Sequence, residues 1–190
     1  VDLKAKPFNL NDEQIKWVED TYNSMSLDEK IGQLFVLLKA IPGVNEEMIK
    51  GTLDQFHQGG LRWQGGDKET VYLQNTTYQK NSNCDDGGIG AVPEGTFVAT
   101  AAECGAGEGT ENAYNLGYVS GKEASAIGCN WMFNPVVDVY KNWRNTIVNT
   151  RSFGSEADKV IDNARAYIKG VKAANPNMAC TAKHFPGDGV

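Results

Sequence analysis

The chain has 190 residues, of which 41% are hydrophobic, a composition that fits one ordinary globular domain and argues against a disordered chain. Its formal net charge of -6 argues against a nucleic-acid partner, because such binding draws most of its affinity from lysine and arginine at phosphates. No apolar run approaches the roughly 20 residues that cross a bilayer, so we expect no membrane partner.

Two helices and a strand are predicted first. Asn11 is placed to cap a helix that runs to about Tyr22. Ser26-Leu-Asp-Glu29 has the pattern of a capping box and predicts a second helix over Lys30–Leu34. That helix leads directly into an apolar segment, Phe35–Leu38, which we interpret as the first strand.

Helix and strand signals then alternate to the end of the chain. After a break at Pro42-Gly43, the predicted elements are a helix over Asn45–Phe56, a strand over Gly59–Trp63, a helix over Asp67–Lys80, a Gly-rich loop over Asp85–Gly90, a strand over Thr96–Thr100, a helix capped by Thr110 and running to about Ile127, a strand over Asn130–Asp138, a helix capped by Ser155 over Glu156–Ala174, and a fifth strand over Met178–Lys183.

This alternation predicts an α/β fold with a parallel sheet and helices packed outside it. The period of roughly 35 residues is close to that of a (β/α)8 TIM barrel, and about five of its eight units are present. The alternative is an open, doubly wound sheet with a nucleotide loop. Its candidate loop, Gly105-Ala-Gly-Glu-Gly109, lacks the G-x-G-x-x-G spacing, and Glu108 would repel a phosphate.

Lys183 and His184 lie at the carboxyl end of the predicted fifth strand, where α/β proteins usually keep their ligand-binding groups. A Pro-Gly-Asp-Gly sequence follows over Pro186–Gly189. A histidine beside such a turn can equally be a hydrogen-bonding group that fixes the loop. The pair therefore needs support from the rest of the chain.

The cysteines show no C-x-x-C spacing and the chain has only two histidines, so we expect neither a metal nor another cofactor. Cys129 and Cys180 are predicted as core residues. Cys84 and Cys104 lie beside predicted loops and are either thiols or a disulfide. Because the first residue is Val1 and not methionine, a leader can already have been removed, which leaves a cytoplasmic and a secreted location both open.

Four segments taken together, in this order and spacing, resemble the amino-terminal barrel of glycoside hydrolase family 3. They are Met25-Ser-Leu-Asp-Glu-Lys-Ile-Gly-Gln-Leu-Phe35, Asn134-Pro-Val-Val-Asp138, Arg151-Ser-Phe-Gly154 and Ala182-Lys-His-Phe-Pro-Gly187. The resemblance covers nearly the whole chain. It implies that residues 1–190 are the amino-terminal portion of an incomplete barrel domain.

The resemblance also implies a retaining hydrolysis of β-linked sugars through a transition state like an oxocarbenium ion. The positions that match the family's sugar-binding residues are Arg151, Lys183 and His184, with Asp138 near the same rim. Each of these residues can instead have a purely structural role. Arg151 can pair with a nearby carboxylate such as Glu156, and Asp138 can simply hold the loop that follows it.

The chain departs from the family pattern at two places. Many relatives carry an acidic residue after the third strand that holds sugar hydroxyls, and Glu103 is the local carboxylate here. Many N-acetylglucosaminidases of the family have Pro-Gly-His-Gly with a catalytic histidine, where this chain has Asp188. Trp63 and Trp131 are candidates to stack on a sugar ring, although Trp131 at a strand position favours a core role.

The family's nucleophile and catalytic acid lie downstream of residue 190, so we assign no catalytic residue and expect the 190-residue chain alone to be inactive. For the complete protein the resemblance favours hydrolysis of terminal β-N-acetylglucosaminides, with β-glucosides as the alternative. A different class of hypothesis is a noncatalytic sugar-binding or assembly subunit that lends its strand edge to a partner. The oligomeric state is left open.

Overall fold

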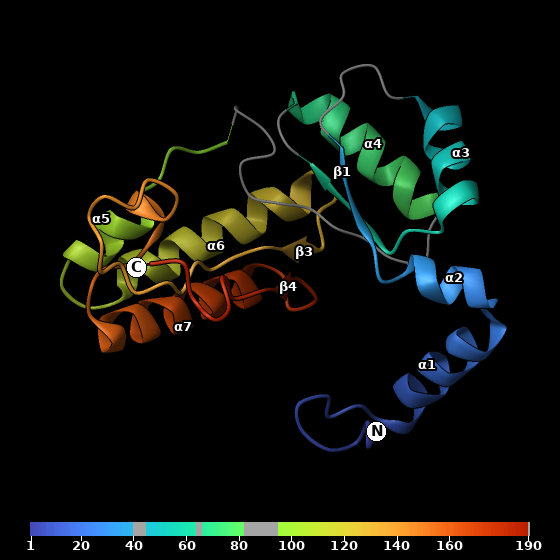
Figure 1. The fold of residues 1–190 in the computed structure, drawn as a ribbon, viewed down its shortest axis with the longest axis horizontal. Helices are drawn as coiled ribbons and strands as arrows, with labels where there is room; N and C mark the ends of the chain where they lie inside the picture. Colours follow the sequence, from blue (N-terminus) through green and yellow to red (C-terminus); the bar gives the residue numbers. More distant parts are fainter. Residues whose placement is uncertain (40–44, 64–65, 82–94, 190) are drawn as a thin grey trace.

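The computed structural model describes residues 1–39, 45–63, 66–81 and 95–189, which form short strands flanked by helices (Figure 1). The elements are α1 (Asp12–Ser24), α2 (Leu27–Gly32), β1 (Val36–Lys39), α3 (Glu46–Phe56), β2 (Gly60–Trp63), α4 (Lys68–Asn81), α5 (Ala101–Ala106), α6 (Glu111–Ala126), β3 (Trp131–Met132), the 3-10 turn η1 (Asn149–Arg151), α7 (Ala157–Ala174) and β4 (Ala179–Cys180). The predicted break at Pro42-Gly43, the predicted loop Asp85–Gly90 and Cys84 lie outside the described residues.

Helices α1, α2 and α5 begin at capping boxes, in which two residues three apart exchange side-chain and backbone hydrogen bonds. The pairs are Asn11 with Gln14, Ser26 with Glu29, and Thr100 with Glu103. The predicted caps Asn11 and Ser26 are confirmed, but the second helix runs over Leu27–Gly32 and not over Lys30–Leu34 as predicted. Helix α5 was not predicted, because the glycines from Gly105 onward indicated a loop.

The remaining helices match their predicted ranges to within a few residues, but two predicted caps are wrong. Thr110 precedes α6 without a side-chain hydrogen bond to the helix. Helix α7 begins one residue later than predicted, with Glu156 and not Ser155 at its N-cap, again without a capping hydrogen bond. Both helices are held instead by the apolar faces that they pack together, as tertiary packing usually requires.

The strands form two parallel pairs in the described part of the chain, and not one five-stranded sheet. β1 pairs with β2, and β3 pairs with β4. A further bridge between Val136 and Lys183 continues the second pair toward its carboxyl end. The predicted strand Thr96–Thr100 is extended but unpaired, and the N–H of Thr96 donates to the Glu123 carboxylate at 2.9 Å. A side chain of α6 therefore takes the place of a neighbouring strand there.

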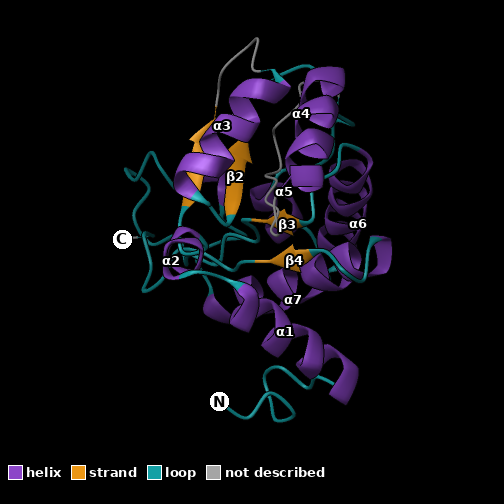
Figure 2. Ribbon diagram, turned by 90° about the vertical axis from the view of Figure 1, so that its right-hand side faces the viewer, coloured by secondary structure: helices purple, strands orange, loops and turns teal. Residues whose placement is uncertain are grey.

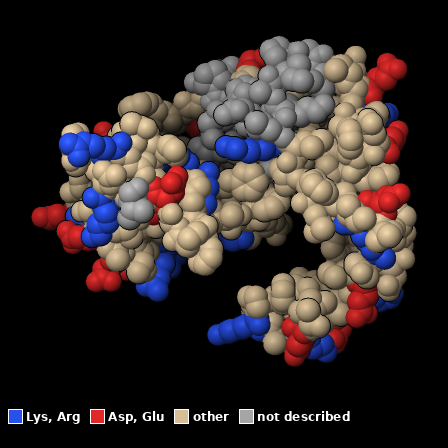
Figure 3. Space-filling view, viewed as in Figure 1, with Lys and Arg blue, Asp and Glu red and all other residues tan. Residues whose placement is uncertain are grey.

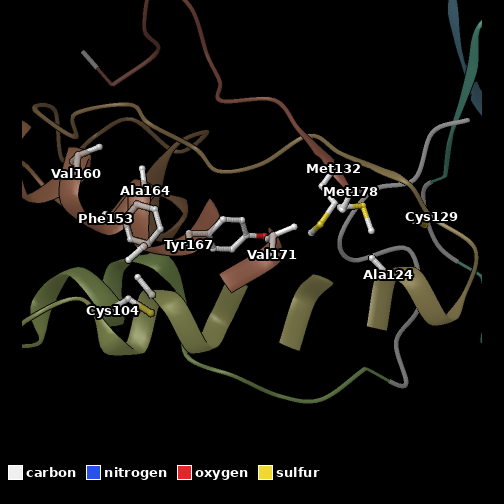
Figure 4. Packing of buried hydrophobic residues seen from close by; sticks show 12 residues of the cluster. Cys104, Ala124, Cys129, Met132, Phe153, Val160, Ala164, Tyr167, Val171 and Met178 are labelled. Atoms are coloured by element: carbon white, nitrogen blue, oxygen red, sulfur yellow. The ribbon is translucent and has the colours of Figure 1, made fainter. Parts of the chain in front are cut away.

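Helices α6 and α7 lie side by side and enclose the larger hydrophobic core (Figure 4). Phe153, Tyr167 and Met178 are buried members of this core. The two backbones come so close that a Cβ atom added to Gly117 would lie 2.1 Å from the carbonyl oxygen of Tyr167. One added to Gly170 would lie 2.1 Å from a carbonyl oxygen of α6. Glycine at both positions therefore permits this packing.

A smaller core joins β1 and β2 to α3 and α4. Its buried members are Ile49, Leu53, Leu61, Val71 and Tyr78. Two side chains of α4 connect this part to the end of α6, since the Asn75 amide donates to the carbonyl oxygen of Ile127 at 2.7 Å and the Gln79 amide donates to that of Gly128. Figure 2 shows the strands in the middle with α3, α4, α6 and α7 around them.

Helix α1 lies next to α2 at the edge of the molecule (Figure 1) and has no buried residue. Trp17 and Tyr22 are consequently exposed on it. Within the described ranges, none of the helices is long and apolar enough to cross a bilayer.

Candidate functional site

The last strand pair places Lys183 at the carboxyl edge of the sheet. The Lys183 N–H donates to the carbonyl oxygen of Pro135 at 3.0 Å, and the Val137 N–H donates to that of Lys183 at 2.6 Å. These two bonds extend the pairing of β3 with β4 as far as residue 183. His184 and the following turn then leave the sheet at the edge where parallel α/β folds gather their ligand groups.

Asp138 is the buried centre of this edge. Its Oδ2 atom lies 2.7 Å from Nδ1 of His184 and also accepts the His184 backbone N–H at 3.2 Å. Its Oδ1 atom accepts the Asp188 backbone N–H at 2.5 Å. Burial by itself would raise the pKa of Asp138, but the hydrogen bonds from His184 and Asp188 outweigh it and hold that pKa below the ordinary 3.8.

The segment Arg151–Gly154 is hydrogen-bonded to the residues around Asp138. The Ser152 hydroxyl donates to the carbonyl oxygen of Asp138 at 2.6 Å, and the Gly154 carbonyl oxygen accepts the Tyr140 N–H at 2.9 Å. The Gly189 backbone lies so near that a Cβ atom there would be 2.2 Å from the carbonyl oxygen of Val139. The loops after residues 138, 151 and 183 are therefore joined into one hydrogen-bonded structure.

Two arginines lie in the neighbourhood of Lys183. Burial lowers the pKa of the Lys183 ammonium, and the nearby guanidinium groups of Arg151 and Arg62 lower it further. Among the described residues no carboxylate forms an ion pair with any of the three. Figure 3 shows lysine and arginine atoms near the middle of the view, among others spread over the surface. The charges of Lys183, Arg151 and Arg62 are thus available for a ligand rich in oxygen atoms.

Arg62 was not among the predicted site residues. It lies in β2, a strand far from the other motifs in the sequence, and only the fold brings it near Lys183. Its position at a strand end after two glycines was the available signal.

Arg151 makes no ion pair with Glu156 or Asp158. Its Nη1 atom donates to the carbonyl oxygen of Ile147 at 2.8 Å, and the residue is exposed. It also lines a cavity of about 250 Å³ together with Thr100, Asn134 and Tyr167. Burial raises the pKa of the Tyr167 phenol at the back of this cavity. Arg151 therefore lines the cavity and also acts electrostatically on Lys183.

Glu103 is placed differently from the other predicted site residues. Its carboxylate accepts both the backbone N–H and the hydroxyl of Thr100, at 2.7 and 2.9 Å, and these bonds lower its pKa. Thr100 and Ala101 line the cavity beside Arg151, whereas Glu103 is not among its lining residues. The structure thus brings together Asp138, Arg151, Lys183 and His184, and gives Glu103 a helix-capping position.

Trp131 and the cysteines of the described residues contribute to packing within the fold. The Trp131 indole donates to the Thr181 hydroxyl at 2.7 Å and packs edge-on against Phe133. Cys129 is buried, as predicted for the core, and Cys180 is half-buried. Cys104 is a buried thiol near the end of α5, which is one of the two alternatives that the sequence left open. In the described residues, no three histidine, cysteine or acidic side chains are grouped to hold a metal ion.

Known proteins share this sequence and fold. A β-N-acetylglucosaminidase/β-glucosidase of Cellulomonas fimi is 37% identical over 199 aligned positions, which cover 100% of this chain and 34% of that protein. A β-hexosaminidase of Pseudomonas aeruginosa is 37% identical over 79 residues, covering 42% of this chain and 23% of the relative. The chain therefore spans about a third or less of the length of these relatives.

Among solved structures, the "Beta-glucoside phosphorylase BglX bound to 2FGlc" superposes with a TM-score of 0.89 and 32% identity, over 99% of this chain and 35% of that one. A family 3 β-N-acetylglucosaminidase of Paenibacillus shares the fold with a TM-score of 0.74 and 24% identity, over 87% of this chain and 34% of that one. These neighbours have the TIM-barrel type of fold that the sequence predicts.

The family model described as "Glycosyl hydrolase family 3 N terminal domain" matches residues 26–190. This range includes all of the residues gathered around Asp138. The chain therefore belongs to glycoside hydrolase family 3.

Proposed function

We propose that the complete protein removes terminal β-linked N-acetylglucosamine residues with retention of configuration, and that residues 1–190 supply the sugar-binding side of its active site. The observation that carries this proposal is the convergence of Arg151, Lys183 and His184 at one carboxyl edge, organised by the buried Asp138. The names of the relatives support the reaction class.

The charges suggest how the sugar is oriented. The transition state of glycoside cleavage carries positive charge near the anomeric carbon. A cation 5 Å away would oppose a full unit of that charge by roughly 3 kcal/mol at an effective dielectric constant of 20. Lys183 and Arg151 therefore face hydroxyls remote from the anomeric carbon, where each charge-assisted hydrogen bond contributes about 1.5–3 kcal/mol. Nucleophile and acid come from the later part of the protein.

The choice between two sugars rests on the motifs and on the relatives. The Met25–Phe35 segment and Pro186-Gly187 after Lys-His-Phe favour N-acetylglucosaminides. The relative from C. fimi carries both activities in its name, so β-glucosides stay the alternative. Initial rates on a panel of aryl β-glycosides would decide. We expect the highest kcat/KM for the N-acetylglucosaminide, and a higher value for the glucoside would reverse the assignment.

Phosphorolysis is a second candidate, favoured by the similarity to the BglX structure and by three cations that form no ion pair with a carboxylate of the described residues. In that reaction a phosphate oxygen bonds to the anomeric carbon while the bond from that carbon to the enzyme carboxylate breaks, and water is not consumed. Rates measured with and without phosphate, with detection of the sugar 1-phosphate, separate the two outcomes. A noncatalytic sugar-binding subunit is less well supported, because the named relatives are enzymes.

The proposal also holds that residues 1–190 are one portion of a larger barrel domain and do not hydrolyse glycosides by themselves. The mass of the intact protein purified from its source tests the first part. Turnover of an aryl β-glycoside by the isolated chain, abolished by Lys183→Ala, would overturn the second part.

A further inference from the structure

Both oxygen atoms of the Asp138 carboxylate already accept hydrogen bonds from the chain, and the side chain is buried. Its side chain is 0% exposed, and Oδ2 serves two donors of His184 while Oδ1 serves the Asp188 N–H. Because the carboxylate is fully buried beneath these donors, a sugar hydroxyl could reach it only if they moved aside, which would leave a buried polar group unsatisfied. Direct contact with the substrate is thus the less favourable role for this residue.

The His184 ring, by contrast, is in partial contact with solvent, with 35% of its side chain exposed. An ionised carboxylate can only accept hydrogen bonds. The 2.7 Å contact therefore requires the proton on Nδ1, and in the neutral ring Nε2 is left as an acceptor. The depressed pKa of Asp138 agrees with an ionised partner at neutral pH.

We propose that Asp138 is a positioning residue, which holds His184 in the Nδ1–H tautomer so that Nε2 accepts a hydrogen bond from a sugar hydroxyl while the adjacent Lys183 ammonium donates one. This inference rests on the proposed function in so far as the ligand is a sugar. A sugar hydroxyl can donate to Nε2 of His184 and accept from the Lys183 ammonium at the same time. The site should therefore prefer a free hydroxyl to a substituent that cannot do both. A fluorine at that carbon can accept from lysine but cannot donate to Nε2.

The isosteric substitution Asp138→Asn tests this role of the carboxylate. In Asp138→Asn one oxygen becomes an NH2 group, which must face either the two donors of His184 or the N–H of Asp188. If the NH2 group faces the ring, it donates to Nδ1 and moves the ring proton to Nε2. If it faces Asp188, the ring tautomer is kept but the turn loses its anchor.

The tautomer can be measured on the complete protein without any substrate. Two-bond nitrogen–proton correlations of the ring, assigned by comparison with His184→Ala, distinguish Nδ1–H from Nε2–H. We expect Nδ1–H in the wild type, and Nε2–H there would overturn the inference. This result does not depend on whether the protein is a glycosidase, nor on whether Asp138→Asn folds.

Kinetics then test the consequence for the substrate. We expect Asp138→Asn to lower kcat/KM for the aryl β-glycoside by roughly 10- to 100-fold, as for other residues that orient a functional histidine. The exposed Asp158 on α7 supplies the control, because Asp158→Asn makes the same change of charge away from the site. In a His184→Ala background the Asp138→Asn change should cause little further loss. Fully additive losses would contradict action through His184.

Deoxy and deoxyfluoro substrates complete the test. In the wild type, one position of the sugar should show a loss of kcat/KM for the fluoro compound, which cannot donate to Nε2, and an equal or larger loss for the deoxy compound, which also lacks the acceptor for lysine. The loss for the fluoro compound should shrink in Asp138→Asn. A fluoro compound as good as the parent at every position would refute an acceptor at Nε2. If the wild type cleaves no aryl β-glycoside, the proposed function fails, while the tautomer still decides the positioning role.

Discussion

Replacing Gly117 by alanine should destabilise the protein, because α6 and α7 leave no room for a methyl group where they meet. The added Cβ atom would lie 2.1 Å from the carbonyl oxygen of Tyr167 and 2.8 Å from its carbonyl carbon. Both are backbone atoms, so relief requires the helices to separate. Overpacking of this kind typically costs about 1–3 kcal/mol. The gain in helix propensity opposes it by up to about 1 kcal/mol.

We therefore expect Gly117→Ala to lower the free energy of unfolding by about 1–2 kcal/mol. Gly51→Ala is the matched control, since Gly51 lies inside α3 and a Cβ atom there meets nothing within 4 Å. That change should raise the stability by roughly 0.5–1 kcal/mol through helix propensity alone. Urea-induced unfolding of the complete protein, followed by circular dichroism, measures both. Equal effects of the two substitutions would refute the close packing of α6 on α7.

Three further predictions concern the site. Lys183→Met should raise the thermal unfolding midpoint slightly, because burial and two neighbouring arginines disfavour the ammonium, as its lowered pKa indicates; a lower midpoint would contradict this. The pKa of Asp138 is below 3.8 in the folded protein, so the ionised carboxylate stabilises the fold above that pH, and this stabilisation is lost as the pH falls through the folded-state pKa. Asp138→Asn should therefore flatten the acidic part of a plot of unfolding free energy against pH. Thr100→Ala should cost about 1 kcal/mol of stability by removing the cap of α5, whereas Thr100→Ser should retain most of it; equal losses would show that the hydroxyl is not the cause.

The helices were the most predictable part of the fold, because their starts are encoded locally. The residues that form the capping boxes of α1 and α2 lie three apart, so a short stretch of sequence suffices to recognise them. Thr100 and Glu103 have the same spacing, yet the glycines that follow outweighed the signal. Strand pairing was less predictable, since Thr96–Thr100 has an apolar pattern but bonds to Glu123 of α6.

The site could be predicted as a set of residues but not as an arrangement. Lys183 and His184 were identified from their place after a strand and from the family motif. The role of Asp138 depends on contacts with residues 46 and 50 positions away, which no local pattern reveals. The approach of Arg62 to Lys183 depends likewise on how β2 lies relative to β4.

The claim that this edge binds the sugar is tested most directly by comparing kcat/KM of the wild type and of Lys183→Met on an aryl β-N-acetylglucosaminide, using the complete protein. Loss of one charge-assisted hydrogen bond of about 1.5–3 kcal/mol predicts a decrease of roughly 10- to 150-fold, with the protein still folded. A Lys183→Met protein that keeps its activity to within about twofold, far less than such a bond is worth, would contradict the account.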